Sequence, residues 1–199
     1  ALLNFIMLLG WNPGTEKEFY TLEEFIKDFS IGKIHKTDLV AFDRQKLLWM
    51  NSQYIQKLTD EEFAKRSLKF APAGAKEEFL INIAPLVKSR IKTFSELKDL
   101  IGFFFEKPKV DKKMLGENYK EHLQNAIEVI EDIEDWNLEK LGSFLLERID
   151  RKKFHTGNFF MDLRIAITGR KFTPPINDSI VILGKDETLK RIKSVLANL

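Results

Sequence analysis

The sequence contains no cysteine, few glycines or prolines, and no long apolar run. With 10 Gly and 6 Pro in 199 residues, it is neither collagen-like nor of low complexity. The lack of cysteine excludes a disulfide framework, a thiolate zinc site and a cysteine nucleophile. No apolar run reaches the roughly 18 residues of a transmembrane helix, and the first residues lack the features of a signal peptide. We therefore expect a globular chain with no membrane partner.

Catalytic signatures are missing as well. The phosphate-binding patterns G-x-x-x-x-G-K-[ST] and G-x-G-x-x-G do not occur, and no serine lies in a nucleophile elbow. His35, His122 and His155 have no second ligand at helical spacing, so we expect solvated or capping histidines and no metal site. The carboxylates at residues 132–135 are predicted to lie on an exposed helix, where nothing raises a pKa for acid catalysis. The residues therefore predict no catalytic site.

Helix signals are frequent along the chain. Capping boxes, in which a hydroxyl and a glutamate satisfy the first free amides of a helix, are predicted at residues 21–24, 59–62 and 93–96. Asn137 is a predicted cap for a helix whose apolar stripe is Leu138, Leu141, Leu145 and Ile149. The first ten residues resemble the middle of a buried helix and lack an initiator Met, so we expect a piece of a longer protein. Most of the chain is predicted to be helical.

Two segments near the end of the chain are ambiguous. Residues 164–169 and 179–184 are short, rich in β-branched residues and bounded by glycine. Taken alone they predict two strands, and short buried helices fit nearly as well.

Charge is unevenly distributed although the net charge is only +2. Residues 65–113 contain 12 basic and 6 acidic side chains, residues 117–150 contain 3 and 10, and residues 151–199 contain 10 and 4. Two basic blocks separated by an acidic one could present two positive surfaces to one polyanion. The alternative is that Lys- and Glu-rich helices simply have solvated faces.

Two basic clusters are candidate binding sites. Lys88, Arg90 and Lys92 lie between an apolar helix and the capping box at 93–96, where an arginine is placed to meet an anion or a base edge. The second is Arg164 with the proline-stiffened loop 168–175, a combination suited to unpaired RNA bases. The alternative for the second cluster, which the residues alone favour, is a plain connecting loop with Arg164 in a salt bridge.

Several motifs resemble the bacterial-type glutamyl-tRNA synthetases. In chain order these are residues 1–11 (ALLNFIMLLGW), 20–24 (YTLEE), 42–55 (FDxxKLxWMNxxYI), 163–169 (LRIAITG), 173–176 (TPPI) and 183–189 (LGKDxxL). Neither class I signature, of the H-I-G-H or the K-M-S-K-S type, is present. The resemblance therefore places the chain after the catalytic half.

The resemblance implies an all-α fold, a helical bundle or cage with little or no sheet, and helices at both ambiguous segments. It implies three parts: the end of a stem-contact domain at 1–57, and anticodon-binding helical subdomains at 58–116 and 117–199. The parent would be a cytoplasmic, monomeric class I glutamate–tRNA ligase that uses ATP and Mg in the missing half. This fragment should hold no cofactor and be inactive alone.

The resemblance also implies the binding residues. Arg90 aligns with the arginine that recognises the third anticodon base in glutamate-only enzymes, and Arg164 with the arginine at the first base. Thr173, Pro174 and Ile176 align with residues around the middle base. Candidate phosphate-binding residues are Lys88, Lys92, Arg170 and Lys171.

The implied partner is tRNA(Glu), with no DNA. One alternative is a relaxed or tRNA(Gln)-directed sister enzyme. The other is a non-catalytic helical scaffold that binds protein.

Overall fold

The computed structural model describes residues 1–34 and 41–198, so His35 lies outside the described residues. Eleven α-helices account for most of these residues, and the one β-type pairing among them is an isolated bridge between Trp11 and Ile34. None of the described helices is long and apolar enough to cross a bilayer. The predicted all-α fold is confirmed.

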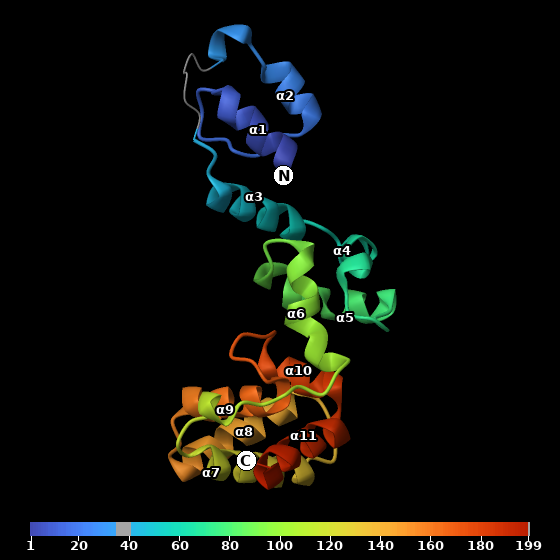
Figure 1. Ribbon diagram of the computed structural model, residues 1–199, viewed down its shortest axis with the longest axis vertical. Helices are drawn as coiled ribbons and strands as arrows, with labels where there is room; N and C mark the ends of the chain where they lie inside the picture. The colour runs from blue at the N-terminus through green and yellow to red at the C-terminus, as the bar shows by residue number, and fades with distance from the viewer. Residues whose placement is uncertain (35–40, 199) are drawn as a thin grey trace.

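The elements follow one another along an elongated molecule (Figure 1). One end holds α1, α2 and the short 3-10 helix η1, and α3 leads away from it towards the middle. The middle contains α4 to α6 with η2 to η5, and the other end is a bundle of α7 to α11 preceded by η6. The bounds are Leu2–Gly10 (α1), Leu22–Asp28 (α2), Ile31–Lys33 (η1), Arg44–Gln56 (α3), Asp60–Ser67 (α4), Leu68–Phe70 (η2), Glu77–Val87 (α5), Lys88–Arg90 (η3), Phe94–Glu96 (η4), Leu97–Ile101 (α6), Gly102–Phe104 (η5), Lys112–Met114 (η6), Tyr119–Asp132 (α7), Leu138–Lys152 (α8), Thr156–Thr168 (α9), Ile176–Leu183 (α10) and Lys185–Asn198 (α11).

The predicted helix starts are confirmed. Thr21, Thr59 and Thr93 each form a complete capping box, with the hydroxyl and the glutamate both engaged. The side chain of Asn137 accepts a hydrogen bond from the Lys140 amide at the start of α8. These starts were predictable because a cap depends only on residues within one turn.

The two ambiguous segments are helical, within α9 and α10. Strands were the wrong alternative, and the helices implied by the resemblance are correct. In α9 the four consecutive residues 165–168 are all buried, so no polar face marks the helical period. A run buried on every side cannot be assigned from periodicity alone.

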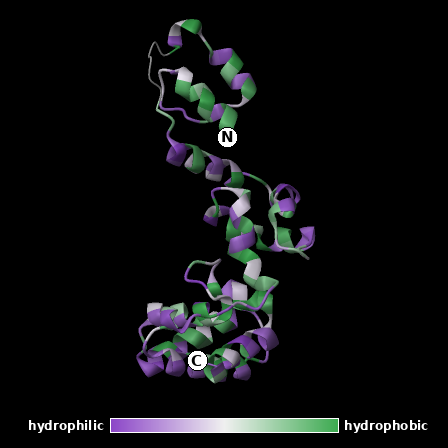
Figure 2. Ribbon diagram, in the orientation of Figure 1, coloured by the Kyte–Doolittle hydropathy of each residue, from purple (hydrophilic) through white to green (hydrophobic). Residues whose placement is uncertain are grey.

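The first helix is less buried than predicted. In α1 only Asn4 and Phe5 are buried, while Leu2, Leu3 and Ile6 are each more than half exposed. Figure 2 shows apolar turns along α1 and α2 at this free end. Asn4 instead holds the region together, because its amide donates to Glu18 O (2.7 Å) and accepts from the Tyr20 amide (2.7 Å).

Two apolar cores support the rest of the chain. The first lies between α4, α5 and α6, and the second fills the bundle of α7 to α11. Ile55 of α3 belongs to the first core, and Val110 and Leu115 of the intervening segment pack against the second. The connections on either side of the middle part are therefore held by packing.

His122 corrects the prediction of solvated histidines. It is 5% exposed, and its Nδ1 lies 2.6 Å from Oδ2 of the buried Asp162. The other oxygen of Asp162 accepts a hydrogen bond from the Gly116 amide (2.7 Å), so this pair ties the segment before α7 to α9. His155 does act as a cap, since its ring accepts a hydrogen bond from the Asn158 amide at the start of α9.

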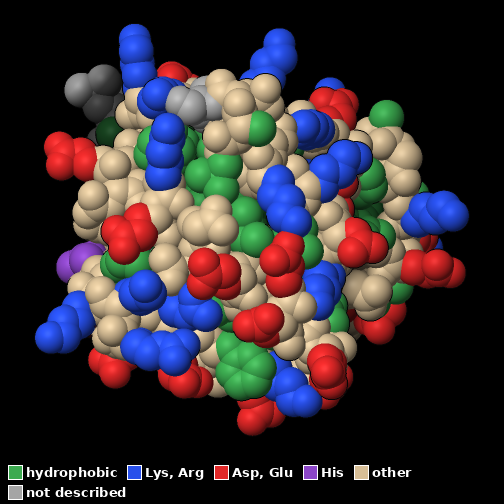
Figure 3. All heavy atoms as spheres, turned by 90° about the horizontal axis from the view of Figure 1, so that it is seen from below, with side chains coloured by type: hydrophobic (Ala, Val, Ile, Leu, Met, Phe, Trp, Pro, Cys, Tyr) green, Lys and Arg blue, Asp and Glu red, His purple; other side chains and the backbone are tan. Residues whose placement is uncertain are grey.

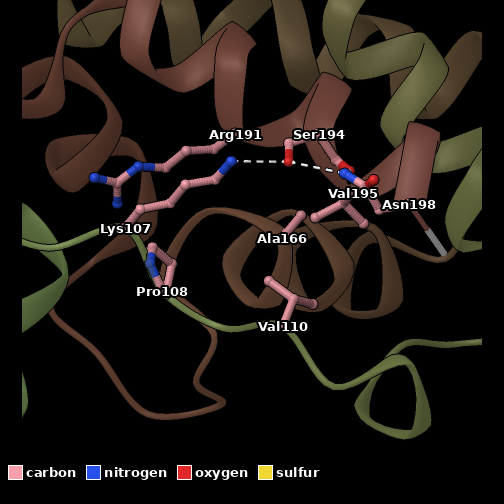
Figure 4. A pocket seen from close by; sticks show the side chains of 8 residues that line it. All are labelled: Lys107, Pro108, Val110, Ala166, Arg191, Ser194, Val195 and Asn198. Atoms are coloured by element: carbon pink, nitrogen blue, oxygen red, sulfur yellow. Dashed lines mark hydrogen bonds between the residues drawn. The ribbon is translucent and has the colours of Figure 1, made fainter.

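Arg191 joins the middle part to the bundle. Its side chain is 4% exposed, and Nη1 donates to Phe103 O (2.7 Å) in η5 and to Ile167 O (3.0 Å) in α9. Beside it, Lys107 donates to Ser194 Oγ (2.9 Å) across a small cavity of about 120 Å³ (Figure 4). The side chains of one helix thus fasten two parts of the molecule to each other.

The carboxylate that accompanies Arg191 predicts a pH dependence of stability. A hydrogen bond from Arg191 Nε (2.7 Å) holds the pKa of Glu187 below its usual value. The stabilisation is therefore complete above the ordinary glutamate pKa of about 4.3 and is lost as pH falls through the lower folded-state value. We expect Glu187→Gln to be less stable than the parent in urea unfolding at pH 7, with the difference shrinking towards pH 3.

The control for this prediction is Glu147→Gln, on an exposed turn of α8. A stability difference for Glu187→Gln that stayed constant between pH 7 and pH 3 would contradict the predicted role of the carboxylate.

Candidate nucleic-acid interface

Arg90 is held at a rigid junction in the middle part. It ends η3, and its Nε donates back to Leu86 O (3.1 Å) in the preceding helix. On one side Lys88 Nζ donates to Leu58 O (2.9 Å), and on the other Asn51 of α3 donates to Lys92 O (2.6 Å). The backbone that carries Arg90 is therefore fixed from both sides.

Arg164 approaches the same region from α9. Burial, and in addition the positive charge of Arg90, lowers the pKa of its guanidinium below the usual value. The two arginines, 74 positions apart in sequence, are thus close enough to repel each other. The structure does not bear out the predicted salt bridge of Arg164, since no acidic side chain of the described residues pairs with it.

One nitrogen of Arg164 is unsatisfied. Its Nε is buried and has no hydrogen-bond acceptor among the described residues. A buried donor without an acceptor costs about 1–3 kcal/mol, and more when it is charged.

A cavity opens between the middle part and the loop that follows α9. It has a volume of about 280 Å³ and lies between Arg90 and Leu100 on one side and Arg170 and Phe172 on the other. In Figure 1 this loop projects from the bundle towards α6. Arg170 lies 3.5 Å from Asp99, which also lines the cavity. The second predicted cluster therefore lies beside the first.

Gly169 sets the direction in which this loop leaves α9. It ends the helix in the left-handed conformation, with φ of 69°. A Cβ atom there would lie 2.8 Å from Lys109 O, so the backbone of the connecting segment presses directly against this turn. Thr168 reinforces it, because its hydroxyl donates to Arg164 O (2.7 Å).

Of the residues predicted to surround the middle base, Thr173 and Pro174 lie in the loop, and Ile176 begins α10 and belongs to the core of the bundle. Thr173, Pro174 and Ile176 are all buried, and the Thr173 hydroxyl donates to Pro174 O (2.8 Å). None of the three lines the cavity beside Arg90. Their contact with a base stays a prediction, and the structure places them where they hold the loop in shape.

The predicted phosphate-binding residues differ in their surroundings. Lys88 is partly buried and paired with Asp60 at 2.7 Å. Lys92, Arg170 and Lys171 are exposed. Phosphate contacts by these three side chains stay a prediction, and Arg170 is also within 3.5 Å of Asp99, whereas Lys88 is engaged within the fold.

Phe172 was overlooked in the sequence, although it lies inside the loop already singled out. The ring is 62% exposed, and its centroid lies 6.0 Å from the guanidinium carbon of Arg90. An aromatic residue next to Lys171 in a proline-stiffened loop is the available sequence signal, because basic residues interleaved with aromatics are typical of single-stranded nucleic-acid binding.

The far end of the bundle differs from the cavity region in its distribution of charge. Figure 3 shows basic and acidic side chains interspersed over this face, so no field of one sign develops there. No group of three His, Cys, Asp or Glu side chains that could hold a metal ion occurs within 1–34 and 41–198. The cavity differs from this face, because the guanidinium groups of Arg90 and Arg170 both line it.

This arrangement is suited to unpaired, negatively charged nucleic acid. Guanidinium groups donate to base edges and phosphates in a planar fork, and the cavity walls also contain the carboxylates Glu96 and Asp99, which can accept from a base amino group. Unpaired bases are recognised in this way on rigid loops.

Comparisons with known proteins agree with this chemistry. Residues 62–196 match a family described as an anticodon binding domain. A glutamate–tRNA ligase from Clostridium tetani is 39% identical over 203 residues, which cover 97% of this chain and 41% of that protein. One from Bacteroides thetaiotaomicron is 35% identical, over 97% of this chain and 40% of that protein.

A solved structure of a glutamate tRNA ligase also matches this chain. The crystal structure of a glutamate tRNA ligase from Elizabethkingia meningosepticum, in complex with its amino acid, superposes with a TM-score of 0.87 at 26% identity. The match covers 100% of this chain and 41% of that one. The chain thus spans about two fifths of the length of the relatives it matches.

Proposed function

The chain belongs to the anticodon-binding domain family, as the region found in glutamate–tRNA ligases, and we propose that it binds tRNA(Glu) and recognises its anticodon. The observation that carries this proposal is the cavity where Arg90 of the middle part meets Arg170 and Phe172 of the loop after α9. Arg90 also lowers the pKa of the Arg164 guanidinium, so these two side chains share one region. An unpaired anticodon supplies the negative charge and the acceptors that this pair of side chains needs.

The proposed binding divides between two kinds of contact. Lys92, Arg170 and Lys171 neutralise phosphates and set the position of the RNA. Arg90 recognises the third anticodon base and Arg164 the first, through the planar fork of the guanidinium group. Thr173, Pro174 and Ile176 shape the loop at the middle base.

The proposed parent is a class I glutamate–tRNA ligase that attaches glutamate to tRNA in the cytoplasm and acts as a monomer. ATP and magnesium would be held in a part of the parent outside this chain, and the present chain alone would be inactive. Within it, residues 1–57 would end the stem-contact domain, and residues 58–116 and 117–199 would form two anticodon-binding subdomains.

A helical scaffold that binds protein is the rival of a different class, and salt separates the two. Each phosphate contact makes the logarithm of the affinity for single strands fall by about 0.7 per tenfold rise in salt. With three or more such contacts, we expect the affinity for tRNA(Glu) to fall by at least about two orders of magnitude per tenfold increase. Binding of tRNA that is absent or independent of salt would contradict the proposal.

Replacing Arg90 with glutamine tests the specificity. We expect the variant to lose about 1–3 kcal/mol of discrimination between C and G at the third anticodon position. The reason is that the neutral amide cannot reproduce the charged donor fork. The measurement is a titration of each protein with tRNA(Glu) and with its C-to-G copy.

Lys98→Gln, an equal change of charge on an exposed side chain of α6, serves as the control. If Arg90→Gln rejected the altered tRNA as strongly as the parent does, the assignment of Arg90 would be wrong. A parent that already bound both tRNAs equally would favour the relaxed or tRNA(Gln)-directed sister enzyme.

A further inference from the structure

Phe172 is the most exposed aromatic side chain in the neighbourhood of the two arginines, and nothing in the fold requires it. The ring is 62% exposed, whereas the residues that follow it, Thr173 and Pro174, are buried. Removing an exposed ring has little effect on packing, so a substitution at this position reports on binding more than on stability.

The surroundings of the ring define what that ligand is. Phe172 forms one wall of the 280 Å³ cavity, with Arg90 and Ile91 across from it. The guanidinium carbon of Arg90 lies 6.0 Å from the ring centroid, a distance at which the cation is within reach of the ring. A flat, polar group entering the cavity would therefore meet an aromatic face and a donor fork together.

We propose that Phe172 is a stacking platform for the unpaired base whose edge Arg90 recognises. This inference rests on the proposed function and adds a contact that depends on the face of the base instead of its edge. Aromatic side chains stack with any base, because every base has a π-face. The ring supplies affinity, and the arginine beside it supplies discrimination.

The two contributions predict different results for two variants. Phe172→Ala should weaken the binding of tRNA(Glu) by about 5- to 150-fold, the range of base–aromatic stacking. The same substitution should weaken binding of the C-to-G copy by the same factor, so that the ratio of the two affinities is unchanged. Arg90→Gln should change the ratio. A side chain with a merely structural role would not separate affinity from discrimination in this way.

Two further variants make the test specific. Phe172→Trp should keep an affinity close to that of the parent, because the larger ring also stacks. Phe172→Leu should bind as weakly as Phe172→Ala, because a leucine side chain is apolar but has no π-face. Phe144→Ala is the matched control, since that ring is 42% exposed on α8. Urea unfolding of each variant confirms that the fold is retained.

The outcomes are distinguishable. If the parent binds tRNA(Glu) and Phe172→Ala binds it within twofold of the parent, or if Phe172→Leu binds as well as Phe172→Trp, the stacking role is overturned. A parent that binds no tRNA overturns the proposed function itself, and that result is seen before any substitution is made.

Discussion

Replacement of Arg191 by methionine is expected to lower the free energy of unfolding by about 3–5 kcal/mol. The guanidinium is buried and donates to two backbone carbonyls, Phe103 O and Ile167 O, that belong to different parts of the fold. Methionine fills a similar volume and leaves both carbonyl groups without this donor. A charged hydrogen bond contributes about 1.5–3 kcal/mol, which accounts for the size of the loss.

The measurement is urea unfolding of the variant beside Lys190→Met, which removes the same charge from a side chain that is 72% exposed on the same helix. The control should change the free energy of unfolding by less than about 0.5 kcal/mol. Arg191→Lys keeps the charge without the fork and should recover only part of the loss. A loss below 1 kcal/mol for Arg191→Met would show that the middle part and the bundle are held together by other contacts.

Replacement of Gly169 by alanine is expected to have the second large effect, lowering the free energy of unfolding by about 2–5 kcal/mol. The left-handed conformation costs a residue with a Cβ about 1–2 kcal/mol. In addition the new Cβ would lie 2.8 Å from Lys109 O, and relieving such overpacking costs about 1–3 kcal/mol. Because the loop with Arg170 and Phe172 begins here, we also expect weaker tRNA binding.

Two other glycines separate the two causes. Gly74 has φ of 86° and open space around it, so Gly74→Ala measures the conformational cost alone. Gly102 has an ordinary helical φ of −55° and also has open space, so Gly102→Ala should be neutral or stabilising. If Gly169→Ala and Gly74→Ala lost the same free energy of unfolding, close contact with the Lys109 backbone would not matter.

The helix starts could be predicted from sequence because each depends on a few neighbouring residues. Thr59 and Glu62 form their box within one turn, and Asn137 caps α8 in the same local way. Residues 164–169 are ambiguous because burial on nearly every side removes the period, and residues 179–184 because the exposed Ile182 is as apolar as the buried Ile180. There the resemblance, and not the pattern, gave the correct answer.

Contacts between distant residues were beyond sequence reasoning. The sequence predicts a solvated or capping His122 because its partner, Asp162, lies 40 positions away. The exposure of Phe172 and its approach to Arg90 depend in the same way on how the bundle docks against the middle part. The burial of Arg191 could not be predicted either, because Lys193 lies equally next to the buried Ile192 on α11 and its side chain is 55% exposed.

We propose that recognition is divided, with two arginines from separate parts of the fold recognising different bases of one anticodon. The most direct test is to titrate the parent, Arg90→Gln and Arg164→Gln with tRNA(Glu) and with two copies, one altered at the first anticodon base and one at the third. We predict that Arg90→Gln loses discrimination at the third base alone and Arg164→Gln at the first base alone. Discrimination that is retained in both variants, or lost at the same base in both, would contradict the claim.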